Sequence, residues 1–250
     1  MENIYDWTKL DDSLNNFSIV LDEKQKSQFL CYYQLLLEWN SFMNLTAITD
    51  FNEVVSKHFV DSLSLIKVYN ISKNVDIIDI GTGAGFPGIP LKIVFPEIKI
   101  TLLDSLNKRV HFLEEVINRL GLHDIIAVHG RAEELAARKE YRELYDVCVS
   151  RAVANLSTLS ELCLPFVKVG GKFISYKSEK LSEEIKLAEG AIDILGGKVS
   201  GQEQFMLPYT DIQRNLLVID KIKTTPKKYP RRPGTPAKEP LYRKKTGSAE

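Results

Sequence analysis

Apolar positions in the first part of the chain recur with the spacing of helices. Asp22 is placed to cap a helix whose apolar side chains return at helical intervals: Phe29, Tyr32, Leu36 and Trp39. Further helical stretches are expected over residues 51–59 and 61–69. Such segments cannot bury their apolar faces alone, so we expect a helical cap over residues 1–72 that packs on the domain that follows.

From residue 75 the pattern changes to short β-branched runs separated by helices. The predicted strands cover 75–80, 98–103, 125–128, 145–149, 172–176 and 215–222. Most lie about 20 to 26 residues apart, the spacing of βα units in a parallel sheet. A further strand is expected within 197–208, forming an edge hairpin with 215–222. This pattern predicts an α/β fold over residues 73–222.

One helix between the second and third runs is especially well marked. Its apolar stripe consists of Leu106, Val110, Leu113, Ile117 and Leu120. Gly121 follows where a helix would end, and glycine readily adopts the left-handed conformation that terminates helices. We therefore expect a helix that ends at Leu120.

The C-terminal end of the chain is strongly basic. The whole chain has no net charge, but residues 221–250 hold ten Lys or Arg against two Glu, and 10 − 2 = +8. Four of the prolines in this stretch oppose a regular helix, so residues 223–250 are predicted to be an extended basic arm: Pro226, Pro230, Pro233 and Pro236. A basic arm favours a polyanionic partner such as nucleic acid, and a merely solvated tail is the alternative.

Other classes of protein are disfavoured by composition. No apolar run approaches the roughly 20 residues of a membrane helix, and the chain begins without the pattern of a secretory signal. The cysteines, Cys31, Cys148 and Cys163, form no C-x-x-C pair and are expected as reduced thiols, mostly in the core. A cytoplasmic protein without a metal site is the resulting expectation.

A glycine-rich turn follows the first predicted strand directly, from Asp79 to Gly88. Gly81, Gly83 and Gly85 let the backbone turn tightly with no Cβ in the way, so a ligand can approach the main chain. Pro90 suits the first turn of the following helix, whose N-terminus would then face the site. The turn predicts a nucleotide or nucleoside cofactor.

Two cofactor classes use such turns. The dinucleotide pattern G-x-G-x-x-G is formally complete from Gly83 through Gly85 to Gly88. Asp79 argues against it, because a carboxylate there would repel a pyrophosphate but suits the cationic amino-acid end of S-adenosylmethionine. We therefore expect S-adenosylmethionine as the cofactor.

Two later turns fit the same nucleoside. Asp104 closes the second strand, where an acid can accept hydrogen bonds from both ribose hydroxyls. The loop Gly130-Arg131-Ala132-Glu133 after the third strand would lie beside the adenine. Glu133 also fits a simpler role as an acid in the first turn of a helix.

With these residues assembled, the chain resembles the ribosomal RNA small-subunit methyltransferase G family, also called glucose-inhibited division protein B. The matching stretches are 39–40, 43–48, 58–63, 79–90, 104–105, 108–109, 112–113, 130–133, 150–153, 170–171, 176–177, 231–234 and Pro236. The Gly-Phe-Pro-Gly extension of the turn, with Asn-Leu-Thr upstream and the Pro-Gly arm downstream, makes the resemblance specific.

The resemblance implies methyl transfer to N7 of a guanosine in 16S rRNA, near the decoding site of the small ribosomal subunit or its assembly intermediate. It implies a class I S-adenosylmethionine-dependent methyltransferase fold: a Rossmann-like, seven-stranded, mostly parallel sheet with an N-terminal helical region and a basic C-terminal arm. Carried over by position, donor contacts fall on Gly81, Phe86, Ala132, Glu133 and Arg151, with Asp104 at the ribose. No membrane and no metal are implied.

Such a reaction needs no catalytic base, because guanine N7 has a lone pair and no proton. The enzyme has only to align N7 with the sulfonium methyl, the reacting atoms about 3 to 3.5 Å apart. The sequence agrees: Ser150-Arg151-Ala152-Val153 follows the fourth strand, without the Asn- or Asp-Pro-Pro-aromatic motif of many amine methyltransferases.

Several basic residues are candidates for RNA or donor contacts. Arg151 could hold the donor carboxylate or an RNA phosphate, or form an ion pair with a neighbouring acid. Lys177 ends the fifth strand and is a candidate RNA contact, while a structural role is favoured for His58. Arg231 and Arg232 are predicted to position phosphate without reading sequence.

Three other functions are considered. A methyltransferase of small molecules is disfavoured by the basic arm. An NAD-dependent oxidoreductase is disfavoured by Asp79 and by the absence of a Tyr-x-x-x-Lys pair on any predicted helix. A non-catalytic RNA-binding module would need an aromatic-studded sheet face or a basic recognition helix, and the sequence predicts neither.

Overall fold

The computed structural model describes residues 5–152, 154–177 and 181–242. The strands are β1 Asp76–Ile80, β2 Lys99–Asp104, β3 Ile125–His129, β4 Tyr145–Ser150, β5 Val167–Lys177, β6 Gly197–Met206 and β7 Gln213–Lys221. The longer helices are α1 Thr8–Asn15, α2 Glu23–Met43, α5 Gly88–Val94, α6 Asn107–Leu120, α8 Leu156–Cys163 and α9 Leu181–Ile194. Short helical turns complete the set: α3 Phe51–Val54, η1 Val55–Val60, α4 Asp61–Leu63, η2 Ser64–Lys67, α7 Ala132–Leu135, η3 Leu164–Phe166 and α10 Thr235–Lys238.

All seven strands form one sheet in the order β3-β2-β1-β4-β5-β7-β6. The first five pair in parallel, and β7 runs antiparallel to both β5 and β6. The predicted α/β fold and the late edge hairpin are therefore confirmed. Helix α6 ends at Leu120, with Gly121 in the left-handed conformation, as its pattern predicted.

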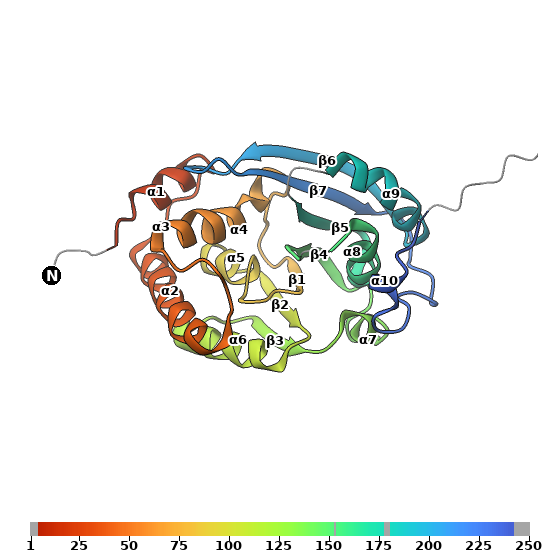
Figure 1. Cartoon of the computed structure of the whole chain (residues 1–250), viewed down its shortest axis with the longest axis horizontal. Helices are drawn as coiled ribbons and strands as arrows, with labels where there is room; N and C mark the ends of the chain where they lie inside the picture. The colour runs from red at the N-terminus through yellow and green to blue at the C-terminus, as the bar shows by residue number, and fades with distance from the viewer. Residues whose placement is uncertain (1–4, 153, 178–180, 243–250) are drawn as a thin grey trace, which may run out of the picture.

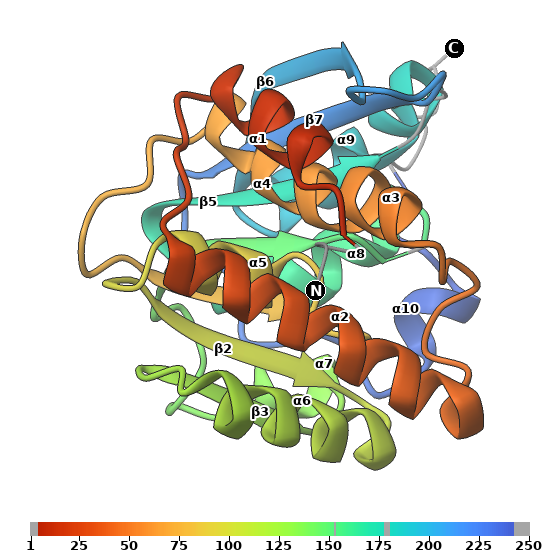
Figure 2. The same cartoon turned by 90° about the vertical axis from the view of Figure 1, so that its left-hand side faces the viewer.

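Helices cover both faces of the sheet (Figure 1). The N-terminal helices, α5 and α6 lie on one face, and α7, α8 and α9 lie on the other (Figures 1 and 2). A hydrophobic core lies on each face of the sheet, and successive residues of β1 contribute to one or the other. Ile77 packs in the core with the N-terminal helices, and Ile78 packs in the core with α8. Burial on both faces explains why the strands read as continuous apolar runs.

Helix α2 joins the N-terminal region to the sheet. Asp22 and Gln25 form a capping box at its start. The side-chain amide of Gln25 also donates to the carbonyl of Ile93 (3.0 Å), and that of Gln28 donates to the carbonyl of Leu120 (2.8 Å). These bonds satisfy carbonyls at the ends of α5 and α6, which otherwise lack partners. The helical region thus packs on the sheet domain through polar as well as apolar contacts.

The two helical stretches expected over 51–59 and 61–69 form one irregular run, α3 to η2. Its middle is a π-helical segment, Val55–Val60. The wider turn brings His58 and Asp61 to the carboxyl end of β4, as their contacts with Arg151 show. π-Helical turns are frequent at functional sites. Apolar periodicity alone does not predict this turn.

The C-terminal segment differs from the extended arm predicted by its prolines. A short helix, α10, begins after Gly234 with Pro236 in its first turn, where the missing amide hydrogen of proline costs nothing. The Thr158 hydroxyl of α8 donates to the carbonyl of Pro236 (2.8 Å). The prediction that no helix forms here was wrong, because proline excludes a helix interior but not its start.

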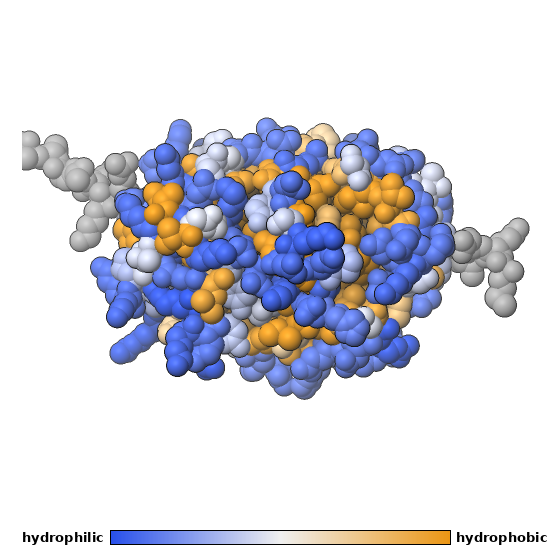
Figure 3. Space-filling model, turned by 180° about the vertical axis from the view of Figure 1, so that it is seen from behind, coloured by the Kyte–Doolittle hydropathy of each residue, from blue (hydrophilic) through white to orange (hydrophobic). Residues whose placement is uncertain are grey.

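Three smaller findings complete the fold. The cysteines are free: Cys148 and Cys163 are buried as expected, and Cys31 is half-buried. No helix in the described part of the chain is long and apolar enough to cross a membrane. Figure 3 shows the side where the parallel strands begin; apolar and polar patches alternate across it.

Candidate functional site

The glycine-rich turn lies at the carboxyl end of β1, between the ends of β2 and β4. The backbone amides of Gly81 and Thr82 donate to the carbonyl of Leu103 in β2, at 2.9 and 3.2 Å. A Cβ on Gly81 would come within 3.5 Å of the Ala152 Cβ, beyond the end of β4. Open α/β sheets bind ligands in such a crevice at the carboxyl ends of their strands.

Two positions of the turn favour glycine for different structural reasons. Gly83 has φ +63° and nothing within 4 Å of a Cβ built on it, so it borders open space. Gly85 has φ +96°, and a Cβ there would lie 2.4 Å from Ile89 Cδ1 and 2.9 Å from the Tyr32 hydroxyl. Gly83 therefore leaves room for a ligand, whereas Gly85 lets the turn pack against α2 and α5.

Asp79 lies beneath the turn, fully buried. Its Oδ2 accepts hydrogen bonds from the Thr82 hydroxyl (2.7 Å) and the Gly88 amide (2.9 Å). Its Oδ1 has no hydrogen-bond partner among the described residues. Burial raises the pKa of Asp79 to about 6, although these hydrogen bonds and Arg151 act in the opposite direction. The carboxylate thus retains an acceptor for a cationic group.

Asp104 lies at the end of β2, almost fully buried. Its Oδ2 accepts from the Gly83 amide (2.9 Å), and its Oδ1 accepts from the Leu106 amide (2.9 Å). These bonds fix the carboxylate beside the glycine-rich turn. Arg109 Nη1 also lies 3.4 Å from Oδ2, and the remaining acceptor capacity of the two oxygens suits the hydroxyls of a ribose.

The loop after β3 continues the site. The Gly130 amide donates to the backbone carbonyl of Asp104 (3.1 Å), which holds this loop against the end of β2. Ala132 is buried at the start of α7. Glu133 is half-buried, and its Oε1 accepts from the amide of Gly234 in the C-terminal segment (2.9 Å). The sequence did not predict this bond.

Arg151 and Phe86 close the other side of the turn. The Arg151 guanidinium lies over the Phe86 ring, 5.0 Å from its centroid, and donates to Asp61 Oδ2 (3.0 Å) and the Lys57 carbonyl (3.1 Å). The ion pair that the sequence left open as an alternative for Arg151 is thus present. Phe86 is buried among Tyr32, His58 and Arg151.

His58 is a neutral structural residue of this wall. Its ring stacks on Phe86, with centroids 4.5 Å apart, and its Nε2 lies 2.9 Å from the Thr46 hydroxyl. Burial, with Arg151 adding to it, lowers the pKa of His58 to about 3. The imidazole therefore stays uncharged at physiological pH.

Asp61 joins two arginines that are far apart in sequence. Its Oδ2 pairs with Arg151, and its Oδ1 lies 3.0 Å from Nε of Arg214, at the start of β7. Asp61 is fully buried, while the arginine side chains retain 20% and 24% exposure. Sequence reasoning missed Asp61 and Arg214; only the position of Asp61 in a family stretch could have drawn attention to it.

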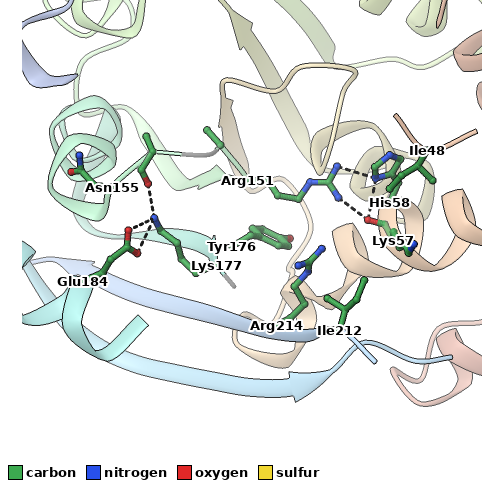
Figure 4. Close-up of a pocket in the computed structure, with 12 residues that line it drawn as sticks. Ile48, Lys57, His58, Arg151, Asn155, Tyr176, Lys177, Glu184, Ile212 and Arg214 are labelled. Atoms are coloured by element: carbon green, nitrogen blue, oxygen red, sulfur yellow. Dashed lines mark hydrogen bonds and ion pairs between the residues drawn. The ribbon is translucent and has the colours of Figure 1, made fainter. Parts of the chain in front are cut away.

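A cavity of about 870 Å³ opens beside these residues (Figure 4). It is lined by Ile48, Lys57, His58, Arg151, Ala152, Ala154, Asn155, Tyr176, Lys177, Glu184, Ile212 and Arg214. Four of the lining residues are basic, and three acids pair with them: Glu53, Asp61 and Glu184. The basic groups outnumber these acids by one, which favours an anionic ligand. Ala152 forms the wall that the cavity shares with the glycine-rich turn.

The other predicted RNA contacts are distributed differently. Lys177 lines the cavity, but its Nζ already bonds the Ala154 carbonyl (2.6 Å) and pairs with Glu184 (3.1 Å). Arg231 is engaged by the fully buried Glu161, through its backbone amide (2.8 Å) and its guanidinium (2.6 Å). Arg231 thus pairs within the protein, because a buried carboxylate needs a paired cation, and its contact with RNA stays a prediction. Arg232 is exposed.

A smaller cavity of about 340 Å³ lies where the strands begin, lined in part by Ile126, Leu144 and Tyr145. It is at the opposite edge from the glycine-rich turn. No cluster of side chains in the described ranges could hold a metal ion. The carboxyl edge of the sheet is therefore the candidate active site.

Comparison with known proteins agrees with this geometry. The profile of the family described as rRNA small subunit methyltransferase G matches residues 25–216. The chain belongs to this family. The methyltransferase G of Lachnoclostridium phytofermentans is 57% identical over 93% of this chain and 96% of the relative. That of Staphylococcus aureus strain JH9 is 50% identical over 94% and 98%. The family resemblance seen in the sequence is confirmed.

Solved structures share the fold of this methyltransferase G family member. TrmN from Thermus thermophilus superposes with a TM-score of 0.52 at 14% identity, covering 67% of this chain and 53% of TrmN. A Bacillus halodurans protein assigned as a methyltransferase superposes with a TM-score of 0.51 at 12% identity, covering 65% and 99%. With the strand order above, they confirm the predicted class I methyltransferase fold.

Proposed function

We propose that this protein transfers a methyl group from S-adenosylmethionine to N7 of a guanosine in 16S rRNA. One observation carries the proposal within the structure: the glycine-rich turn and the cationic cavity share a wall, with Gly81 next to Ala152. A donor held on the turn would therefore face a base held in the cavity. The names of the family relatives support rRNA as the substrate.

The residues around the turn fit the donor. The unpartnered Oδ1 of Asp79 offers an acceptor to its ammonium group, and the open space at Gly83 leaves room for its body. Asp104 would hold the ribose, and the loop with Ala132 and Glu133 would border the adenine. Gly81, Gly85, Phe86 and Arg151 would complete the wall at the amino-acid end. When bound, S-adenosylmethionine supplies an electrophilic sulfonium methyl.

The protein's own contribution is alignment. Guanine N7 needs no deprotonation, and the histidine nearest the turn, His58, is neutral and buried in its ring contacts. The described residues around the cavity therefore hold and orient the base without removing a proton. Placing two reactants in line supplies a large part of the rate enhancement of such reactions.

The cavity would receive the guanosine turned out of the RNA, because an enzyme that modifies a base must bring it out of the stack. Lys57, Lys177 and Arg214 would face its phosphates, and Arg232 would add a contact outside the cavity. The substrate would be the small ribosomal subunit or its assembly intermediate, which places the reaction in the cytoplasm.

The test is methylation of small subunits that lack the modification, with labelled S-adenosylmethionine and mapping of the label on the RNA. We expect one 7-methylguanosine in 16S rRNA. Gly83→Val, which fills the space for the donor, should abolish labelling. Label on another base or in protein, or labelling that survives Gly83→Val, would contradict the proposal.

A further inference from the structure

The C-terminal segment is bound to the body at several points. The guanidinium of Arg142 donates to the carbonyls of Thr225 (2.8 Å) and Tyr229 (2.9 Å). Tyr229 is buried in the core formed with α8 and α9. Arg231 is anchored on Glu161, and Pro236 on Thr158. Residues 225–239 thus form a docked strap, and we use this name for them below.

The strap ends beside the candidate donor site. A chain of three hydrogen bonds leads there from the glycine-rich turn. Gly83 bonds to the Asp104 carboxylate, the Asp104 carbonyl accepts from Gly130, and Glu133 three residues later accepts from Gly234. In Figures 1 and 2, α10 lies on the side where the parallel strands end.

We propose that the strap is a positioning element for the donor: it holds Glu133, and with it the loop of residues 130–133, in the conformation that receives the adenosine part of S-adenosylmethionine. This inference rests on the function proposed above. It gives the basic C-terminal segment a role toward the donor, separate from any contact with RNA.

The geometry of Gly234 explains how the strap reaches Glu133. Gly234 has φ +81°, a left-handed conformation that turns its amide toward the carboxylate just before α10 begins. Arg231, three residues earlier, is fixed by up to four bonds to Glu161 and one to the Glu239 carbonyl. The turn is therefore held on both sides, by an ion pair before it and by Thr158 after it.

Two neighbouring arginines make a natural comparison. Arg231 is half-buried and paired with the fully buried Glu161, whereas Arg232 is exposed, and no side-chain hydrogen bond or ion pair is found for it within the described ranges. If the strap positions the donor site, Arg231 governs donor binding and Arg232 does not. A segment that acts only on RNA would show no such difference in a measurement without RNA.

The experiment measures the affinity of the isolated full chain for S-adenosylhomocysteine by calorimetry. Arg231→Ala should weaken binding by about tenfold, within the range of coupling between linked sites. Thr158→Val, which removes one anchor and keeps the shape of α8, should weaken it less. Lys238→Ala, an exposed basic change in α10, is the matched control and should bind as the wild type does. In turnover with RNA, the KM for the donor should rise and that for RNA should not.

Because coupling is reciprocal, S-adenosylhomocysteine must also stabilise the docked strap. Amide hydrogen exchange of residues 231–239 in the wild-type chain should slow when it is added. This readout does not depend on whether Arg231→Ala folds.

Wild-type affinity in Arg231→Ala and Thr158→Val, together with unchanged exchange in 231–239, would overturn the inference. Failure of the wild-type chain to bind S-adenosylhomocysteine at all would instead overturn the proposed function.

Discussion

Asp79 lies in an environment that its sequence motif does not predict. The motif predicts an acid beside the turn, and the structure places it fully buried with one oxygen unpartnered. A raised pKa means that the folded protein holds the Asp79 proton more tightly than the unfolded chain does. If Asp79 binds the donor ammonium as proposed, donor binding needs the ionised carboxylate and competes with protonation.

A pH dependence follows from the Asp79 pKa of about 6. The ionised fraction grows as pH rises through this value, so affinity for S-adenosylhomocysteine should rise up to about tenfold per pH unit below it and level off above. His58, with a pKa of about 3, does not titrate between pH 5 and 7.5. Calorimetry over that range should show the rise in the wild type and a weak, flat profile in Asp79→Asn. An unchanged profile in the variant would assign the effect to another group.

The two glycines of the turn should respond differently to alanine. Gly83→Ala places a Cβ in open space at positive φ, so it should cost about 1 kcal/mol of stability and strongly weaken donor binding. Gly85→Ala forces the Cβ against Ile89 and Tyr32 and should lower the melting temperature much more. Thermal denaturation and calorimetry on both variants separate these effects. Wild-type donor affinity in Gly83→Ala would show that the donor does not lie against this glycine.

At the scale of elements, Asp61 links the π-helical run, β4 and β7 through two buried ion pairs. Asp61→Asn leaves two partly buried guanidinium groups without a counter-charge and should lower the free energy of unfolding by about 3 kcal/mol. Glu53→Gln breaks the exposed pair with Lys57 and should change it by less than about 1 kcal/mol. Chemical denaturation measures both changes. Equal effects of the two substitutions would refute a structural role for this junction.

Local pattern predicted most elements because each carried its own signal. The strands, α6 and the turn from Asp79 to Gly88 follow from residues close together in sequence. The junction at Asp61 does not, because Asp61 and Arg214 are 153 residues apart and no periodicity relates them. The docking of the strap could not be predicted for the same reason. The proline content describes only the segment itself, whereas its partners, Glu161 and Arg142, are distant in sequence.

For the molecule as a whole, the charge asymmetry of the sequence is smaller in space than along the chain. Lys221 is buried against Glu143, and the half-buried Arg231 is paired with Glu161, so both charges are balanced by acids within the protein. Exposed basic residues of the described C-terminal segment remain on the surface: Lys223, Lys227, Lys228, Arg232 and Lys238. Electrostatic attraction to RNA therefore depends on fewer charges than composition indicates.

A salt titration tests this reduced set. Replacing Lys227, Lys228 and Arg232 together with Ala should weaken RNA binding and reduce the slope of log affinity against log salt by about 2, since each phosphate contact contributes about 0.7 on single strands. The affinity for S-adenosylhomocysteine, measured alongside, should stay at the wild-type value. A slope equal to that of the wild type would assign these residues to solvation alone.

The reversed direction of β7 has a consequence for how members of such a family can diverge. Because β7 runs antiparallel to its neighbours, its first residues lie at the carboxyl ends of the parallel strands. The turn before β7 supplies Ile212 to the cavity, and the start of β7 supplies Arg214. The glycine-rich turn follows β1, and two strands, β4 and β5, lie between β1 and β7 in the sheet. If the cavity binds the target nucleotide as proposed, changes in the β6–β7 turn can alter which nucleotide fits and leave the glycine-rich turn unchanged.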